Sequence, residues 1–421
     1  MSGFNVTIPK DTIKINDNSL EFEIKGDSKY GLDKTIVNGI RRVLLSSLPS
    51  VAFRTESDNP DLVMVKNNSA LHNEYLLHRF SLIPLYLNPL EWNKDLLFKL
   101  NIKNDTNEIR SITAEDIDIY KIKQSIKDSE EKLVGVNIEN YDLNNKLSDK
   151  DKERIFRPFK IDGLTQYCLF TELSSKQSEE NTPEIELYGT PSVSYAYEDV
   201  RWQPVSCAVY SFKEDEKLFI KVAKEKIKVH NILPEHEKDF VNELHVNESE
   251  RYYHRDSNLQ PYWYNFKIDS QGYYSPYTTD KGPGLLVQSC DILINMFNEL
   301  KENFKKVLQG DDESNMTIKK TDNELIYKII IHGGDDTIGS ILQSHVCNKL
   351  IDDESILSLC GYKKLHPLEE IITFTISLNT NNNIVKLDNV QQMNAIVEQM
   401  IVGCDEINLI YEKIKEESEK I

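Results

Sequence analysis

The sequence predicts an α+β protein in which two related modules, each a sheet with long helices, share one chain. Three observations predict it. Residues 33–49 and 336–346 align so that Thr35 falls on Thr337, and both stretches have the periodicity of amphipathic helices. The order strand, helix, strand, long helix occurs twice along the chain. A long region that interrupts only the first copy predicts a mainly β insert domain.

The first module begins with strands and a helix. Apolar and polar residues alternate over residues 4–25, which is strand periodicity. Asp33 is a plausible N-cap for the next helix, which Leu48 and Pro49 end. Its apolar face carries Ile36, Ile40, Val43, Leu44 and Ser47, while Asn38, Arg41, Arg42 and Leu45 lie away from the centre of that face.

The insert is expected over residues 51–207. Residues 102–160 are rich in Asn, Asp, Lys and Glu, and we expect solvent-exposed loops at 128–132 and 144–152. Residues 213–258 are another charged stretch, after which residues 262–268 alternate as a strand. The first module therefore comprises residues 1–50 and 208–308.

A linker at 309–316 separates the modules, because Gln309 to Asn315 is rich in Gly, Asp, Ser and Asn. The second module, residues 317–421, is expected to contain strands at 325–331 and 371–378 and helices at 337–350 and 390–416. Each module has a long helix with an apolar stripe, the first at 285–307. We expect the two long helices to pack together around a pseudo-twofold axis. The pairing residues would be Ile292, Leu293, Met296, Leu300, Phe304, Met393, Val397, Met400, Ile401, Cys404 and Ile407.

Composition excludes several classes of protein. A net charge of -19 argues against nucleic acid as the main direct ligand, since phosphate binding needs a positive surface. No apolar run reaches the length of about 18 residues that spans a membrane. The first seven residues have no basic or apolar segment of a signal peptide. Six scattered cysteines without a Cys-x-x-Cys pair indicate reduced thiols rather than a disulfide framework.

No constellation of residues supports catalysis. Asp116 and Asp118 are the nearest match to paired metal-binding carboxylates, but they lie in a surface-like acidic stretch. The segment from His236 to Phe240 lacks the second histidine of a zinc-protease helix, and the glycines at 282–284 are followed by no phosphate-loop Gly-Lys-Ser/Thr. His72, His78 and His366 fit no metal spacing and are expected to be structural, as Trp202 and Trp263 are expected to be core residues.

Two motif sets are more specific. Residues 38–53 contain Asn38-Gly-Ile-Arg41-Arg42, and residues 67–85 end in His78-Arg79-Phe-Ser-Leu-Ile-Pro84-Leu. Together they resemble the alpha-like subunits of cellular RNA polymerases, namely bacterial alpha, archaeal D and the third eukaryotic subunit. Arg201-Trp-Gln-Pro resembles the segment that closes the inserted domain of that family.

The C-terminal part resembles the smaller partner of that subunit, archaeal L or the eleventh eukaryotic subunit. The motif residues are Thr337, Gly339, Leu342, Gly361, Tyr362, His366 and Pro367. Asp336, Ser340 and Gln343 replace a His, an Asn and an Arg of the family pattern, which puts a partner contact of that Arg in doubt. The cysteine loop that binds zinc in many third subunits is missing at residues 86–100, and Cys168 and Cys207 cannot supply the four ligands of an iron–sulfur cluster. We therefore expect no cofactor and no metal.

The resemblance implies a non-catalytic assembly subunit of a DNA-directed RNA polymerase. Its partners would be the two largest subunits and the small subunits, with internal pairing in place of a heterodimer, little direct DNA contact and no membrane. Docking on the large subunits would use Asn38, Arg41, Arg42, His78, Arg79 and Pro84.

Both resemblances occur in one chain, and such a fused subunit resembles those of the polymerases of large DNA viruses. This implies an intracellular protein of the host cytoplasm and the virion, with the nucleus also open. The alternatives are an autonomous dimerising scaffold or transcription regulator with the same fold, and, with no motif in support, an enzyme.

Overall fold

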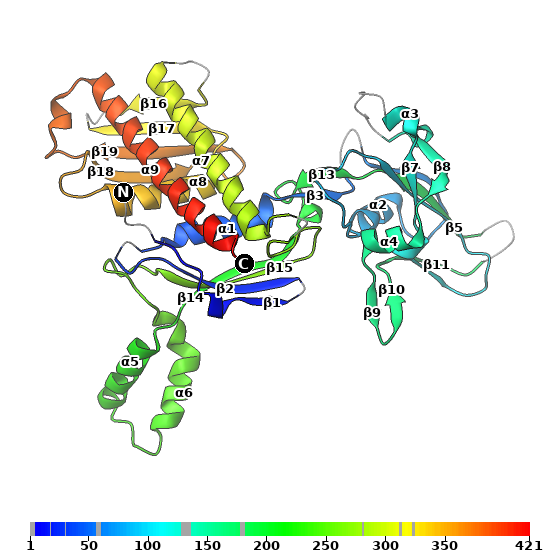
Figure 1. The fold of residues 1–421 in the computed structure, drawn as a ribbon, viewed down its shortest axis with the longest axis horizontal. Coiled ribbons are helices and arrows are strands. Elements are labelled where there is room, and N and C mark those ends of the chain that lie inside the picture. The colour runs from blue at the N-terminus through cyan, green and yellow to red at the C-terminus, as the bar shows by residue number, and fades with distance from the viewer. Residues whose placement is uncertain are drawn as a thin grey trace. The chain divides into compact units, whose positions relative to one another are not determined.

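The computed structural model describes residues 5–16, 18–29, 31–55, 60–127, 136–176, 182–279, 282–310, 314–321 and 325–421. The chain forms two compact units, drawn in Figure 1. The first unit contains Met1–Leu45, Ser206–Ser270 and Ser275–Ile421, and the second contains Ser46–Val205 and Gln271–Tyr274. Among the described residues, no helix is both long and apolar enough to cross a membrane.

One sheet of the first unit has the strand order β1 (Lys14–Asn16), β2 (Ser19–Lys25), β15 (Trp263–Ser270) and β14 (Val205–Phe212). Alternate residues of β2 and β15 are buried, and Phe22 stacks on Phe266 with ring centroids 5.4 Å apart. Strand structure was expected over residues 4–25, but Lys10–Thr12 form a 3-10 turn, closed by a bond from the Thr12 hydroxyl to the Pro9 carbonyl (2.7 Å). That turn interrupts the alternation.

Helix α1 (Lys34–Ser46) follows the first hairpin and buries Ile36, Ile40, Val43 and Leu44 of the predicted apolar face. Ser47, also expected on that face, lies past the end of the helix and is only partly buried. Asp33 stands at its start and accepts a hydrogen bond from the Thr35 amide (2.8 Å), so the predicted cap is confirmed.

Helix α7 (Leu285–Gln309) starts after Gly284. Gly310 follows its last residue and closes the helix with a φ of 71°, in the left-handed region. Its buried seam contains Leu293, Phe297, Leu300 and Phe304. Ile292 and Met296 were expected on this seam but are only partly buried. Each precedes a seam residue by one position, about 100° around the helix, so both lie at the edge.

Residues 316–421 form a second sheet with helices. The strand order is β16 (Met316–Lys320), β17 (Ile326–His332), β19 (Ile371–Leu378) and β18 (Leu357–Lys364). Strands β16 and β18 were not predicted. The expected helix 337–350 is α8 (Asp336–His345) followed by a π-helical turn (Val346–Leu350), and the last helix is α9 (Asn389–Ser418).

The expected linker is only partly described. Gln309 is the last residue of α7, Met316 already begins β16, and residues 311–313 lie outside the described part of the chain.

The charged stretch 213–258 forms a helical hairpin, α5 (Glu216–Val229) and α6 (Glu237–Glu248), between adjacent strands β14 and β15 (Figure 1). The hairpin has a small core of its own in which Phe219, Ala223 and Leu244 are buried.

The second unit is mainly β. Its largest sheet has the order β4 (Leu62–Asn67), β12 (Glu184–Gly189), β5 (Leu96–Lys103), β7 (Asp118–Ile122) and β8 (Tyr141–Lys146). Three strand pairs accompany it: β3 (Pro49–Ala52) with β13 (Ser192–Tyr195), β6 (Arg110–Thr113) with β11 (Leu169–Leu173), and β9 (Phe159–Ile161) with β10 (Leu164–Gln166). Its helices are α2 (Asn73–Ser81), α3 (Gln124–Lys127) and α4 (Asp149–Phe156).

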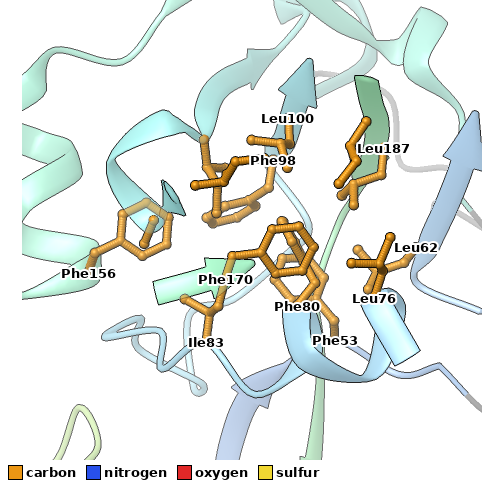
Figure 2. Close-up of a cluster of buried hydrophobic side chains, with 14 of the residues drawn as sticks. Phe53, Leu62, Leu76, Phe80, Ile83, Phe98, Leu100, Phe156, Phe170 and Leu187 are labelled. Carbon is orange, nitrogen blue, oxygen red and sulfur yellow. The ribbon is translucent and has the colours of Figure 1, made fainter. Parts of the chain in front are cut away.

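Figure 2 shows the aromatic centre of this unit, where Phe80 from α2 meets Phe53 and Phe170. The ring centroids lie 5.2 Å and 5.5 Å from that of Phe80. Phe98 of β5 stands edge-on to Phe53 at 5.3 Å. These contacts give the second unit a core independent of the α7 and α9 seam.

The expected loop at 144–152 is wrong, because β8 continues to Lys146 and Ser148 caps α4 by accepting a bond from the Asp151 amide. Helix α4 forms despite its polar sequence because Ile155 and Phe156 pack into the core. The loop expected at 128–132 lies outside the described residues.

Candidate functional site

The contact between α7 and α9 is the most extensive helix–helix contact of the first unit, and the two helices lie side by side in Figure 1. Three polar pairs cross it: Asp291 with Lys415 (2.7 Å), Asn298 with Asn408 (2.9 Å), and Lys301 with Asp405. Taken in this order, the residue numbers on α7 rise by seven and then by three, while those on α9 fall by seven and then by three. The pairs therefore belong to a single antiparallel register.

Apolar side chains fill the space between these pairs. On α9, Val397, Met400, Cys404, Ile407 and Tyr411 are buried, while Met393 and Ile401 are only partly buried. The rings of Phe297 and Tyr411 stack with centroids 6.4 Å apart. Each fully buried large side chain contributes roughly 1.5–3 kcal/mol, so the seam supplies more stability than the polar pairs.

Burial also sets the chemistry of the two cysteines on these helices. Cys290 of α7 and Cys404 of α9 are fully buried, and desolvation raises the pKa of both thiols far above the usual range. Because the thiolate is the reactive form, both residues act as small apolar side chains.

Helices α1 and α8 meet through reciprocal polar contacts, in which a late residue of each helix reaches the first turn of the other. Asp33 accepts hydrogen bonds from the amide and the hydroxyl of Thr35, and Asp335 accepts the same two bonds from Thr337. The hydroxyl of Thr337 also accepts a bond from Arg42 Nε (2.8 Å), and Arg42 Nη2 lies 4.0 Å from Asp335.

The opposite contact uses Ser344, whose hydroxyl donates to Asp33 at 2.5 Å, and Asn348, whose amide donates to Asp33 at 3.0 Å. When Thr35 is aligned with Thr337, Arg42 falls on Ser344 and Asp33 on Asp335. The same two positions thus contact each other in both directions, as at an interface with twofold symmetry.

Close approach at the centre of these helices depends on glycine. A Cβ on Gly39 of α1 would lie 2.7 Å from Ile341 Cδ1 of α8 and 2.8 Å from the Tyr411 hydroxyl of α9. That hydroxyl donates to the Ile36 carbonyl at 3.2 Å. Gly39 and Tyr411 are therefore contact residues outside the predicted pairing set.

The motif residues of the C-terminal part gather around α8 and β18. A Cβ on Gly339 would lie 2.6 Å from Tyr362 Cδ2, so the glycine admits the ring. Leu342 is buried, and the His366 ring accepts a bond from the Leu368 amide (3.2 Å), which is the expected structural role. Gly361 has open space at its Cβ position, and Pro367 is exposed.

The expected docking residues fall into two groups, one in each unit. In the first unit, Asn38 accepts a bond from Arg41 Nε (2.9 Å) on its own helix, whereas Arg42 contacts α8. In the second unit, Arg79 Nε donates to the Phe170 carbonyl (2.7 Å), and His78, Arg79 and Pro84 are all exposed. Asn38, Arg41 and Arg42 are partly buried.

The part of the chain that the structure describes contains no cluster of metal-binding side chains. No group of three or more His, Cys, Asp or Glu side chains there could hold a metal ion, and the six cysteines are free thiols.

Comparison with known proteins points to one family. A family model described as the RNA polymerase Rpb3/Rpb11 dimerisation domain matches residues 30–297. The rpac1 subunit of DNA-directed RNA polymerases I and III of Dictyostelium discoideum is 29% identical over 163 residues, 37% of this chain and 40% of that protein.

Two further relatives match shorter segments. The human subunit RPAC1 of RNA polymerases I and III is 35% identical over 80 residues, 19% of this chain and 20% of the human protein. The archaeal RNA polymerase subunit Rpo3 of Pyrobaculum aerophilum is 44% identical over 55 residues, 13% of this chain and 19% of that protein. The chain thus spans less than half the length of each of these relatives.

Proposed function

This chain belongs to the RNA polymerase Rpb3/Rpb11 dimerisation domain family, and from that premise we propose that it is a non-catalytic assembly subunit of a multisubunit DNA-directed RNA polymerase. Its two alpha-like modules, residues 1–50 with 208–308 and residues 317–421, pair inside one chain. The pair then forms the platform on which the two largest subunits assemble.

The reciprocal contact between α1 and α8 carries this proposal. Symmetric exchange of contacts between equivalent positions is typical of paired copies of one module, and the α7–α9 seam supports the same pairing. Placing both modules in one chain raises the effective concentration of the second to roughly millimolar, which favours internal pairing over a separate partner. Such a fused form is consistent with a polymerase of a large DNA virus that acts in the host cytoplasm and is packaged in the virion.

Docking is proposed to use the partly exposed polar face of α1. Among the described residues, Arg41 bonds to Asn38 of its own helix alone, which leaves its other donors to meet a carboxylate on a large subunit. Arg42 contacts Thr337, which supports a role in module pairing in addition to docking. The exposed His78, Arg79 and Pro84 of the second unit complete the proposed docking set.

The first test is affinity purification of the tagged chain from producing cells, followed by mass spectrometry and an RNA synthesis assay. We expect two large chains to co-purify with DNA-templated RNA synthesis. A folded chain that purifies alone would reject the proposal and favour the autonomous scaffold.

The docking face is tested with Arg41→Glu in the same purification. We expect the variant to fold but to recover far less of the large chains, because a carboxylate would oppose the proposed partner charge. Lys34→Glu, an exposed charge reversal on the same helix, is the matched control. Equal recovery in the two variants would remove Arg41 from the docking surface.

A further inference from the structure

Helix α5 carries an unusual charge pattern for a chain with a net charge of -19. Lys217, Lys221, Lys224 and Lys228 are exposed and follow one another at spacings of four, three and four residues. At 100° per residue these four side chains lie within about 60° of one another around the helix. They form one straight row, which we call the lysine row.

The lysine row faces no carboxylate partner inside the described structure. None of its four lysines forms an ion pair within the described ranges, whereas Lys226, on the inner side of the same helix, is bonded to Glu248 at 2.5 Å. Like charges at these spacings disfavour a free helix, so the row opposes the folding of α5. The stability of the hairpin comes instead from Phe219, Ala223 and Leu244.

The sheet does not require the hairpin either. Strands β14 and β15 are neighbours in the sheet, and the Lys213 amide already donates to the Trp263 carbonyl (2.9 Å) at the base of the excursion. A short turn would join these strands, yet the chain builds two helices between them (Figure 1). The hairpin is therefore an addition that the pairing of these strands does not need.

The chemistry next to the lysine row indicates the kind of partner. Ile220, with half of its surface exposed, and the partly buried Ile227 border one side of the row, and Glu225 borders the other. Helix α6 carries exposed Glu237, Asp239 and Glu243. A nucleic acid presents a negative charge about every 1.7 Å over a long surface, so it would also meet these carboxylates and be repelled by them. One acidic helix is small enough to cover only the lysine row and its apolar border.

We propose that the exposed face of α5 is a docking surface for an acidic helical segment of another protein. The carboxylates of this partner helix repeat at spacings of three and four residues, and an apolar edge beside them covers Ile220. The row runs over 12 residues, and its ends are about 16 Å apart along the helix, so a partner helix of three turns is long enough. This inference does not rest on the proposed polymerase function.

The test uses the full chain and three fluorescent probes in anisotropy titrations at low salt. The first probe is a helical peptide with glutamates at the four row spacings and leucines along one side. The second is the same composition in scrambled order, and the third is a short DNA duplex. We expect the patterned peptide to bind at least tenfold more tightly than the other two probes.

Variants then locate the site. K221E with K224E should reduce binding of the patterned peptide at least tenfold, while K150E with K238E, an equal charge change at two other exposed lysines, should leave it unchanged. Ile220→Ser should weaken the patterned peptide several-fold, and circular dichroism checks that each variant is folded. The proposal is overturned by any of three results. These are equal binding of the patterned and scrambled peptides, tighter binding of the duplex, and equal losses of binding in the two lysine-pair variants.

Discussion

Arg42, near the end of α1, reaches the first turn of α8 although the two helices are far apart in the chain. Its guanidinium donates to the Thr337 hydroxyl, which in turn is bonded to Asp335. Arg41, one position earlier, bonds only to Asn38 on its own helix. Neighbouring arginines of one motif therefore have different structural roles, because they lie about 100° apart around the helix.

Arg42→Ala should lower the free energy of unfolding by about 1 kcal/mol, the usual net value of one hydrogen bond, since the side chain is partly exposed. Urea denaturation measures the change. Arg41→Ala is the matched control and should have a smaller effect. If both variants lose the same stability, the contact with α8 contributes nothing specific.

Asp199 of the second unit makes stability depend on pH. Hydrogen bonds from the Arg201 side chain, the largest cause, lower the pKa of this carboxyl, and Arg201 also donates to Thr55 Oγ1 at 2.7 Å. A carboxyl whose pKa is lower in the folded chain stabilises it above the unfolded pKa, and that contribution is lost as pH falls through the folded pKa.

Asp199→Asn should therefore be less stable than the parent at neutral pH, and the difference should shrink as the pH falls. Urea denaturation of both proteins from about pH 7 to about pH 3, across the usual titration range of a carboxyl, measures it. A difference that grows on acidification would contradict the assignment.

At the scale of elements, polar pairs set the register of α7 against α9, while apolar residues supply the stability. The Asn408 side-chain amide donates to the Asn298 side-chain oxygen across the two helices, and the buried Asn408 oxygen has no hydrogen-bond partner among the described atoms. Asn408 is buried and Asn298 is exposed, so sliding either helix would leave the Asn408 amide without this partner, at a cost of about 1–3 kcal/mol for one buried group. The Asn pair therefore favours one alignment.

The pair Lys301 and Asp405 offers a direct test of this register. Lys301→Asp or Asp405→Lys alone places like charges together, and each should lower stability by up to about 1 kcal/mol because both side chains are partly exposed. The double exchange should restore most of the loss in a urea double-mutant cycle.

The control for that cycle is an exchange of Lys305 and Glu302, which pair on the surface of α7 alone. This exchange should leave stability unchanged. If Lys301→Asp and Asp405→Lys simply add in the double variant, the two side chains do not interact across the helices.

At the scale of the whole molecule, each of the two compact units has its own core. The core of the second unit is centred on Phe53, Phe80, Phe98 and Phe170, while the first unit contains the α7–α9 seam and two sheets. Units with separate cores can unfold in separate steps.

Calorimetry should then resolve two thermal transitions. Phe80→Ala removes a fully buried ring and should destabilise the second unit by about 3–5 kcal/mol, which lowers one transition only. Phe304→Ala, at a fully buried position of α7, should lower the other. One transition that both variants shift equally would show that the chain unfolds as a single unit.

Local patterns in the sequence were sufficient for most of the main elements. Apolar spacing located α1, α7 and α9, and the strand at 371–378 was predicted at its observed bounds. The π-helical turn after α8 was missed, since the sequence pattern there continues that of a helix. Strand β18 was missed because its residues were interpreted only as a family motif. Helix α4 was missed because its sequence is polar and the residues that it packs against are distant in the chain.

The candidate site divides in the same way. The sequence by itself determined the aligned helices, the family motifs and the apolar stripes, since each follows from residue types at fixed spacings along one segment. Only the tertiary structure decided that Arg42 contacts Thr337, that Ser344 contacts Asp33, and that Asn298 contacts Asn408. These contacts join residues more than 100 positions apart, so they depend on how the helices pack, which local periodicity does not specify.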